Sequence, residues 1–341
     1  MIPPLQTLTP RGSQKWISHR PLHTHDFTQM LVFPAGVATD VGNTSRNKVA
    51  LGPIQTHPVL EVSQVKVFIS ADMEGATGIT ASKHTASDSP EYGRMRKLLT
   101  QDVNAAIEGA CEAGATEVLV NDSHGSMINI LIEELDSRAR LISGSTKQLA
   151  QSQGVDSSFD AAFFVAYHAM EGTQDAVINH TLLGRTVSRV LLNGQLVGET
   201  GLNAAIAAHF GVPVVLVTGD DKVSAEARAR LGDIETVCVK QGLDRFVANC
   251  LPPAQTKKMI KEGAARAMRR AKEIKPVVMS KPVTFEVEFK TTAETTLATL
   301  FPEVKLIGPK TISLTGDDMI SAFKMFWGAL ILGRAGAGGV L

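Results

Sequence analysis

The chain has 341 residues, of which 44% are hydrophobic and 20% charged, so it can bury a full core. Its formal net charge at pH 7 is zero and no basic stripe runs along it, which argues against nucleic acid as its main partner. No apolar run is long enough to cross a membrane. Cys111, Cys238 and Cys250 lie far apart, without C-x-x-C spacing, which favours a reducing compartment such as the cytoplasm over a disulfide framework.

Residues 1–64 differ in composition from the rest of the chain. They are rich in Pro, Thr, Ser and His, contain few acids, and show no helical or strand period. We predict a disordered extension here. A targeting peptide is the alternative, because such peptides are also basic and poor in acids, although they should be amphipathic as well. We interpret His19, His23 and His25 as solvated side chains of this extension.

From residue 65 on, apolar strand-like runs alternate with amphipathic helical segments. This alternation predicts an α/β fold with a mainly parallel sheet flanked by helices, and residues 65–220 are expected to form its larger, N-terminal α/β part. Strands are predicted at 65–71, 116–120, 140–142, 161–166 and 212–217, and helices at 91–113, 127–135 and 200–209. Two further strands, 177–180 and 189–197, break this rhythm, and Asn193-Gly194 is typical of a hairpin turn.

Residues 221–341 are predicted to form a smaller α+β C-terminal part, a candidate for oligomerisation. The expected helices are 224–231, 253–274 and 317–334, and the expected strands are 235–239, 283–289 and 304–314. The segment 253–274 is basic and amphipathic, which we interpret as a solvated helix face.

Two carboxylates follow the first buried strand, at Asp72 and Glu74. Residues one apart on an extended backbone point the same way, so the two charges repel unless something positive lies between them. A pair of divalent metal ions is the usual solution. The alternative is that one carboxylate caps the next helix and the other is solvated, and this stretch alone leaves both open.

Five candidate metal ligands lie at the ends of predicted elements. Because the carboxyl ends of parallel strands gather the sites of such sheets, these side chains are expected to converge. Two histidines and three carboxylates fit zinc, with manganese or cobalt as substitutes, and five ligands fit two bridged ions better than one. Asp72, at the strand end, is the natural bridge. The candidates are Asp72, Glu74, His124, His168 and Glu199.

Each candidate also has an ordinary structural explanation when taken alone. His124 could bond the backbone of a turn, and His168 could be a core histidine with satisfied hydrogen bonds. Glu199 could simply favour the first turn of a helix. His180 could be a packed or edge residue of its strand. The joint occurrence at element ends, rather than any single residue, indicates a metal site.

Several motifs resemble, in order and spacing, the zinc-dependent D-aminopeptidases found with bacterial dipeptide-transport genes. They read S-A-D-M-E-G-A-T-G, E-V-L-V-N-D-S-H-G, A-Y-H-A, N-H-T and V-G-E-T-G-L-N-A, and the resemblance covers residues 65–335. It implies a metallopeptidase with two Zn²⁺ per subunit that acts on short peptides with an N-terminal D-residue, such as D-Ala-D-Ala. It also implies a homodecamer of stacked five-membered rings.

The resemblance carries roles to individual residues. Asp72, Glu74 and His168 would hold one zinc ion, and Asp72, His124 and Glu199 the other, with His180 as the catalytic histidine. Two other functions stay open. A two-metal phosphoesterase is one, although little arginine lies near the motifs to bind a phosphate, and Arg94 and Arg185 are the nearest. A non-catalytic, ring-forming peptide-binding scaffold is the second.

Overall fold

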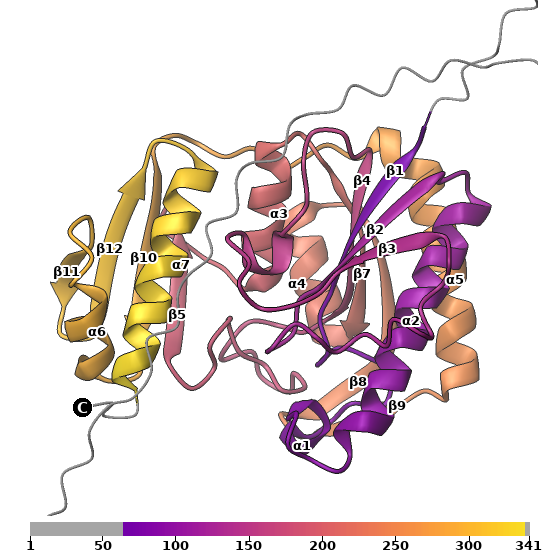
Figure 1. Ribbon diagram of the computed structural model, residues 1–341, viewed down its shortest axis with the longest axis horizontal. Helices are drawn as coiled ribbons and strands as arrows, with labels where there is room; N and C mark the ends of the chain where they lie inside the picture. Colours follow the sequence, from indigo (N-terminus) through magenta and orange to yellow (C-terminus); the bar gives the residue numbers. More distant parts are fainter. Residues whose placement is uncertain (1–63, 338–341) are drawn as a thin grey trace, which may run out of the picture. The chain divides into compact units, whose positions relative to one another are not determined.

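The computed structural model describes residues 64–337. Of the predicted N-terminal extension, residues 1–63 lie outside the described part of the chain. The expectation of an α/β fold is confirmed, because a mainly parallel sheet with helices on both faces forms the larger body (Figure 1). Within the described residues, no helix combines the length and apolarity that a membrane span requires.

The large sheet has seven strands in the order β3-β2-β1-β4-β7-β8-β9, and every pair in it is parallel except β8 with β9. Its central strands are buried on both faces, as strands covered by helices on each side must be. The strands are β1 (Lys66–Ala71), β2 (Glu117–Asp122), β3 (Ala139–Ile142), β4 (Ala161–Tyr167), β7 (Val214–Asp220), β8 (Glu235–Asp244) and β9 (Val247–Cys250).

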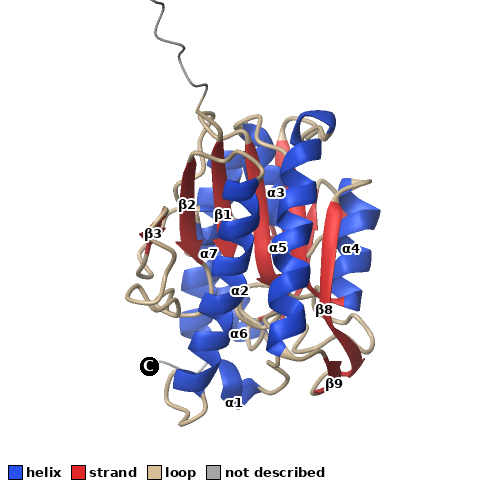
Figure 2. Cartoon of the chain, turned by 90° about the vertical axis from the view of Figure 1, so that its right-hand side faces the viewer, coloured by secondary structure: helices blue, strands red, loops and turns tan. Residues whose placement is uncertain are grey.

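Helices cover both faces of this sheet. Helices α2 (Tyr92–Glu112) and α5 (Pro253–Arg270) pack on each other in front of it in Figure 2, and α3 (Glu199–His209) and α4 (Asp221–Leu231) lie behind it. Their apolar faces form the core with the strands. A short helix, α1 (Ser82–Thr85), and a 3₁₀ turn, η1 (Ala150–Ser152), lie in the connecting loops.

The second sheet is antiparallel, with the order β11-β12-β10-β5-β6. It does not divide the chain at residue 220. Its strands β5 and β6 come from the middle of the sequence, whereas β8, β9 and α5 stay with the large sheet. The remaining elements are β5 (Val187–Leu192), β6 (Gln195–Leu196), β10 (Val283–Phe289), α6 (Thr292–Ala298), β11 (Lys305–Gly308), β12 (Thr311–Gly316) and α7 (Met319–Gly336).

Two predicted elements are wrong. Residues 127–135 form turns instead of a helix, because the buried carboxylate of Asp122 accepts the backbone N–H groups of Asn129 and Ile130. Residues 177–180 are an irregular loop rather than a strand, since Asp220 at the end of β7 takes the backbone N–H of Val177. In both places a buried acid from another element satisfies the backbone donor that regular structure would have used.

The loop after β1 is held by a second buried acid, Asp102 of α2. Its two carboxylate oxygens accept the Thr77 backbone N–H at 2.8 Å and the Thr77 hydroxyl at 2.9 Å. Burial raises the pKa of Asp102 to about 6, and the two bonds from Thr77 only partly offset that effect.

This shift makes stability depend on pH. A carboxyl with a raised pKa in the folded state binds its proton more tightly than in the unfolded state, so its contribution falls as pH rises from about 3.8 to about 6. Relative to Asp102→Asn, the wild-type free energy of unfolding should fall by up to ~3 kcal/mol between pH 4 and pH 7, as urea unfolding would measure. The exposed Asp317→Asn is the control, and a pH-independent difference for Asp102→Asn would contradict the argument.

Candidate metal centre

The candidate site lies at the carboxyl ends of three adjacent strands. Asp72 follows β1, His124 follows β2 and His168 follows β4. The chain runs outward from β1 to β2 and β3, and then returns to the other side of β1 with β4, so the strand order reverses between β1 and β4. The connecting loops separate at such a switch point and leave a crevice for a ligand.

The first group of side chains is Asp72, Glu74 and His124. The Nδ1 atom of His124 lies 2.9 Å from Glu74 Oε2 and 3.5 Å from Asp72 Oδ1. Both carboxylates are almost completely buried, at 2% and 3% exposure. One ligand atom from each of the three residues lies within 4.8 Å of the others, which is close enough for one metal ion to touch all three.

The second group is His168, His180 and Glu199, and one ligand atom from each of these residues also lies within 4.8 Å of the others. The Glu199 Oε1 atom lies 3.3 Å from His168 Nε2 and 3.8 Å from His180 Nε2. Asp72 joins the two groups, because its second oxygen, Oδ2, lies 3.2 Å from His168 Nε2. Its two oxygens therefore face one histidine of each group.

All three histidines are oriented by the backbone. One ring nitrogen of each lies in hydrogen-bonding distance of a carbonyl: His124 Nε2 at 3.1 Å from Thr85, His168 Nδ1 at 2.9 Å from Ala169, and His180 Nδ1 at 2.9 Å from Ile178. A carbonyl only accepts, so a hydrogen sits on that nitrogen and the other nitrogen faces the carboxylates. Metal-binding histidines are held in this way.

The electrostatics of the cluster call for a cation. Burial alone would lower the histidine pKa values, but Glu74, Asp72 and Glu199 outweigh it, so the pKa of His124 and that of His168 rise well above the usual value. Burial acts to raise the pKa of Glu74, but the charge on His124 outweighs it and holds that pKa far below its usual range. Without a metal ion, these carboxylates recruit protons onto the histidines instead.

Three buried atoms at the centre of the cluster make no hydrogen bond within the described chain. They are Asp72 Oδ2, Glu74 Oε2 and His168 Nε2. Nor does any described Lys or Arg side chain pair with Asp72, Glu74 or Glu199. Buried polar atoms are normally satisfied, and a charged one that is not is expected to bind a metal or a proton. The donor set and its unsatisfied atoms therefore fit divalent metal ions.

Unusual backbone conformations position this site. Ala166, two residues before His168, has φ 61°, and the pairing of β4 with β7 shifts register there. Such a bulge bends a strand and redirects the next side chains. The loop after β1 approaches β4 so closely that a Cβ on Gly75 would lie 1.9 Å from the Tyr167 carbonyl oxygen. Only glycine permits this contact.

Sequence reasoning missed the groups that hold Glu199. The side-chain amide of Gln151, in η1, donates to Glu199 Oε2, and the backbone N–H of Leu182 donates to Oε1 at 2.6 Å. Gln151 follows no strand and belongs to no recognisable motif. The only signal for the role of Leu182 is its left-handed backbone angle, φ 59°, which cannot be read from the sequence.

Lys240 of β8 was also missed, and it holds the loop that carries Glu74. Its ammonium group is fully buried and donates to three carbonyl oxygens, those of Glu74 at 2.6 Å, Ala76 at 2.9 Å and Ile79 at 2.6 Å. Burial lowers the pKa of Lys240 to about 8. The three bonds account for all three ammonium hydrogens, so the side chain serves as a fixed clamp on this loop.

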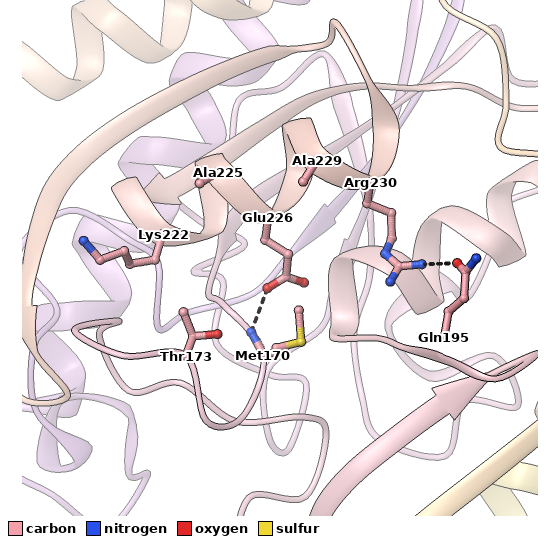
Figure 3. A pocket seen from close by; sticks show the side chains of 8 residues that line it. All are labelled: Met170, Thr173, Gln195, Lys222, Ala225, Glu226, Ala229 and Arg230. Atoms are coloured by element: carbon pink, nitrogen blue, oxygen red, sulfur yellow. Dashed lines mark hydrogen bonds between the residues drawn. The ribbon is translucent and has the colours of Figure 1, made fainter.

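Glu226 of α4 braces the other side of the site (Figure 3). It accepts the Met170 backbone N–H at 2.8 Å, two residues beyond His168, and its other oxygen is packed against Gly198, which precedes Glu199. Burial raises the pKa of Glu226. The surrounding pocket, of about 570 Å³, is lined by residues of α4 and by Met170 and Thr173.

The structure brings all five predicted ligands together, along with His180. Here His124 lies beside Glu74, and His168 lies beside Glu199. Asp220 at the end of β7 caps α4, because its carboxylate accepts two N–H groups at the start of that helix.

The fold and these side chains define an α/β protein with a candidate two-metal centre at the carboxyl ends of its parallel strands. The family profile Peptidase M55, D-aminopeptidase, matches residues 65–328, and the chain belongs to this family. The resemblance seen in the sequence motifs is thereby confirmed.

Two relatives agree with this assignment. The D-aminopeptidase of Bacillus subtilis (strain 168) is 34% identical over 261 residues, which cover 76% of this chain and 94% of the relative. The solved structure of the Zn-dependent D-aminopeptidase DppA from Bacillus subtilis, described as a self-compartmentalizing protease, superposes with a TM-score of 0.77 at 33% identity. That match covers 79% of this chain and 98% of the other.

The clamp at Lys240 yields a prediction. Lys240→Met would leave the buried carbonyls of Glu74 and Ile79 without a donor, whereas that of Ala76 keeps the Ile79 N–H at 3.2 Å. At ~1–3 kcal/mol for each lost donor, the free energy of unfolding should fall by at least ~2 kcal/mol. Because the loop carries Glu74, metal content per subunit should fall as well. Lys222→Met is the control, since Lys222 is partly exposed and bonds only its neighbour Asp221. A variant as stable and as metal-rich as the control would show that the clamp is dispensable.

Proposed function

We propose that this protein is a di-zinc aminopeptidase that hydrolyses short peptides with an N-terminal D-residue, of the D-Ala-D-Ala type. Membership of the D-aminopeptidase family supports the reaction. The observation that carries the metal assignment is the orientation of the three histidines. Each has one nitrogen on a backbone carbonyl and directs the other at buried carboxylates.

Asp72, Glu74, His124, His168 and Glu199 would hold the two ions. The placement of Asp72 supports a bridging role, because its two oxygens face His124 and His168 separately. Bound zinc would polarise the scissile carbonyl and bring the pKa of a coordinated water to ~7, which supplies a nucleophile at neutral pH. A free α-amino group of the substrate would be met by one of these carboxylates or by a metal ion, which suits a substrate with a free N-terminus.

We assign proton transfer, rather than metal binding, to His180. Its ring stacks on that of His168, with centroids 4.0 Å apart and planes 11° apart. Lone pairs of parallel stacked rings run side by side and do not converge, so one ion cannot lie on both at the ~2.0–2.1 Å of a Zn–N bond without a ring rotation. His180 is also less buried than His168, at 16% against 1% side-chain exposure, and so can reach a substrate.

We extend self-association to this chain, with stacked five-membered rings as the expected assembly. Apolar side chains on the β8–β9 hairpin support it, since Leu243, Phe246 and Val247 are about half exposed in the single chain. Light scattering of the full-length protein would measure the number of subunits. A reducing compartment, such as the cytoplasm, stays a prediction, supported by three cysteines that form no disulfide.

The reaction is tested with a panel of dipeptides. The zinc-loaded protein should hydrolyse D-Ala-D-Ala faster than L-Ala-L-Ala, and a chelator should abolish both activities until zinc is restored. Release of free alanine is the measurement, and p-nitrophenyl phosphate serves as the comparison for a two-metal phosphoesterase. Turnover of the phosphate ester above that of every peptide would overturn the proposal, as would zinc-loaded protein without peptide hydrolysis.

The separate roles of Asp72 and His180 give a second test. Asp72→Asn should lose zinc and activity together, because both ions would lose a charged ligand. His180→Ala should keep its zinc and lose ~10²–10⁴-fold in kcat, the usual contribution of a general acid or base. The zinc content per subunit, measured by elemental analysis, distinguishes a metal ligand from a residue that acts only in proton transfer. Loss of zinc in His180→Ala would make His180 a ligand, and a near wild-type rate would remove it from the mechanism.

A further inference from the structure

A second, larger pocket of about 900 Å³ begins at the metal centre. Its lining includes His124 and also Gln151, which bonds Glu199. The same lining includes Trp327, Ile331 and Arg334 of α7, a helix that packs on the second sheet. A substrate bound at the metals can therefore extend along this pocket toward α7.

The charged side chains of this pocket are mainly cationic. Arg185 and Arg334 line it, and the only carboxylate in the lining is that of Asp88. Neither guanidinium makes a hydrogen bond or an ion pair with a residue of the described range 64–337. Exposed arginines elsewhere in that range, such as Arg138 and Arg266, do pair with acids. An unpaired guanidinium beside a metal centre is available to an anionic group of the substrate.

Arg185 is tied to the metal centre by its own loop. Three residues earlier, the Leu182 N–H donates to Glu199. Gly184, directly before Arg185, packs on the His180 ring, so that a Cβ there would lie 2.9 Å from His180 Cβ. The backbone N–H of Val187 then closes the loop on the Leu183 carbonyl at 2.8 Å. These contacts fix where the Arg185 side chain starts relative to the candidate ligands.

We propose that this pocket receives the C-terminal side of the peptide, and that Arg185 binds its terminal carboxylate. The inference rests on the proposed aminopeptidase function. In a dipeptide, only one residue, spanning ~3.5 Å, separates the scissile bond from the carboxylate, so a cation close to the metals is needed to reach it. The planar guanidinium can bind both carboxylate oxygens at once. Arg334 lies on α7 and suits the carboxylate of a longer peptide.

This assignment makes the enzyme selective for short peptides with a free C-terminus. The test compares kcat/KM for D-Ala-D-Ala with that for D-Ala-D-Ala amide, which carries no terminal charge. D-Ala-p-nitroanilide, which lacks the second residue altogether, reports the cleavage reaction by itself. The wild-type enzyme should favour the acid over the amide by about tenfold or more, the equivalent of one charge-assisted hydrogen bond.

Variants of Arg185 test whether this side chain causes the preference for the acid over the amide. Arg185→Gln should bring the acid-to-amide ratio close to one, mainly by raising KM for the acid, and Arg185→Lys should retain part of the preference. The ratio is read within each variant, so a general loss of activity cancels. Arg189→Gln is the matched control, because Arg189 lies nearby on β5, faces Glu288 and does not line the pocket. It should keep the wild-type ratio.

The outcomes separate this inference from the proposed function. Wild-type enzyme that cleaves D-Ala-p-nitroanilide but treats acid and amide alike would overturn the carboxylate site and leave the aminopeptidase intact. A wild-type preference that survives in Arg185→Gln would overturn the role of Arg185. Zinc-loaded enzyme that cleaves none of the three compounds would overturn both. The first comparison needs no variant, so it does not depend on whether Arg185→Gln folds.

Discussion

The structure depends on one electrostatic constraint, which is the burial of three carboxylates at a single edge of a sheet. Asp72, Glu74 and Glu199 are each at most 3% exposed, and each faces one or two of the three histidines of the site. No described Lys or Arg side chain is paired to these carboxylates. Taking such charges out of water costs several kcal/mol each unless cations replace the lost solvation. Hydrogen bonds from Gln151, the Leu182 backbone N–H and Lys240 hold Glu199 and the loop of Glu74 in this arrangement.

The topology explains why the constraint falls at this place. The strand order reverses between β1 and β4, so the loops after β1, β2 and β4 leave the sheet in different directions and their side chains meet over the gap. The left-handed conformations of Ala166 and Leu182 lie in the segments that carry His168 and contact Glu199. Such conformations cost ~1–3 kcal/mol and persist where the surroundings over-determine them. Strain is thus concentrated around the candidate ligands.

Sequence patterns predicted the sheet class and the ligands because both follow from local rules. Alternating strands and helices imply parallel pairing, and parallel pairing places Asp72, His124 and His168 at one edge. The failures have a different physical origin. The turns at residues 127–135 depend on Asp122, and Lys240 and Gln151 act on loops far from them in the chain. No local pattern reports a contact that exists only after the chain has folded.

The position of Lys240 in the chain also bears on how the site comes into being. Its ammonium closes the loop of Glu74, Ala76 and Ile79 across sequence separations of 166, 164 and 161 residues. During synthesis, Asp72, Glu74 and His124 emerge well before β8. The loop that carries Glu74 therefore stays open until more than half of the described chain has followed. Contacts of such long range form late, after the entropy of closing a long loop has been overcome. Metal capture at Asp72, Glu74 and His124 would therefore be coupled to completion of the sheet, and an ion bound there would stabilise a strand encoded far downstream.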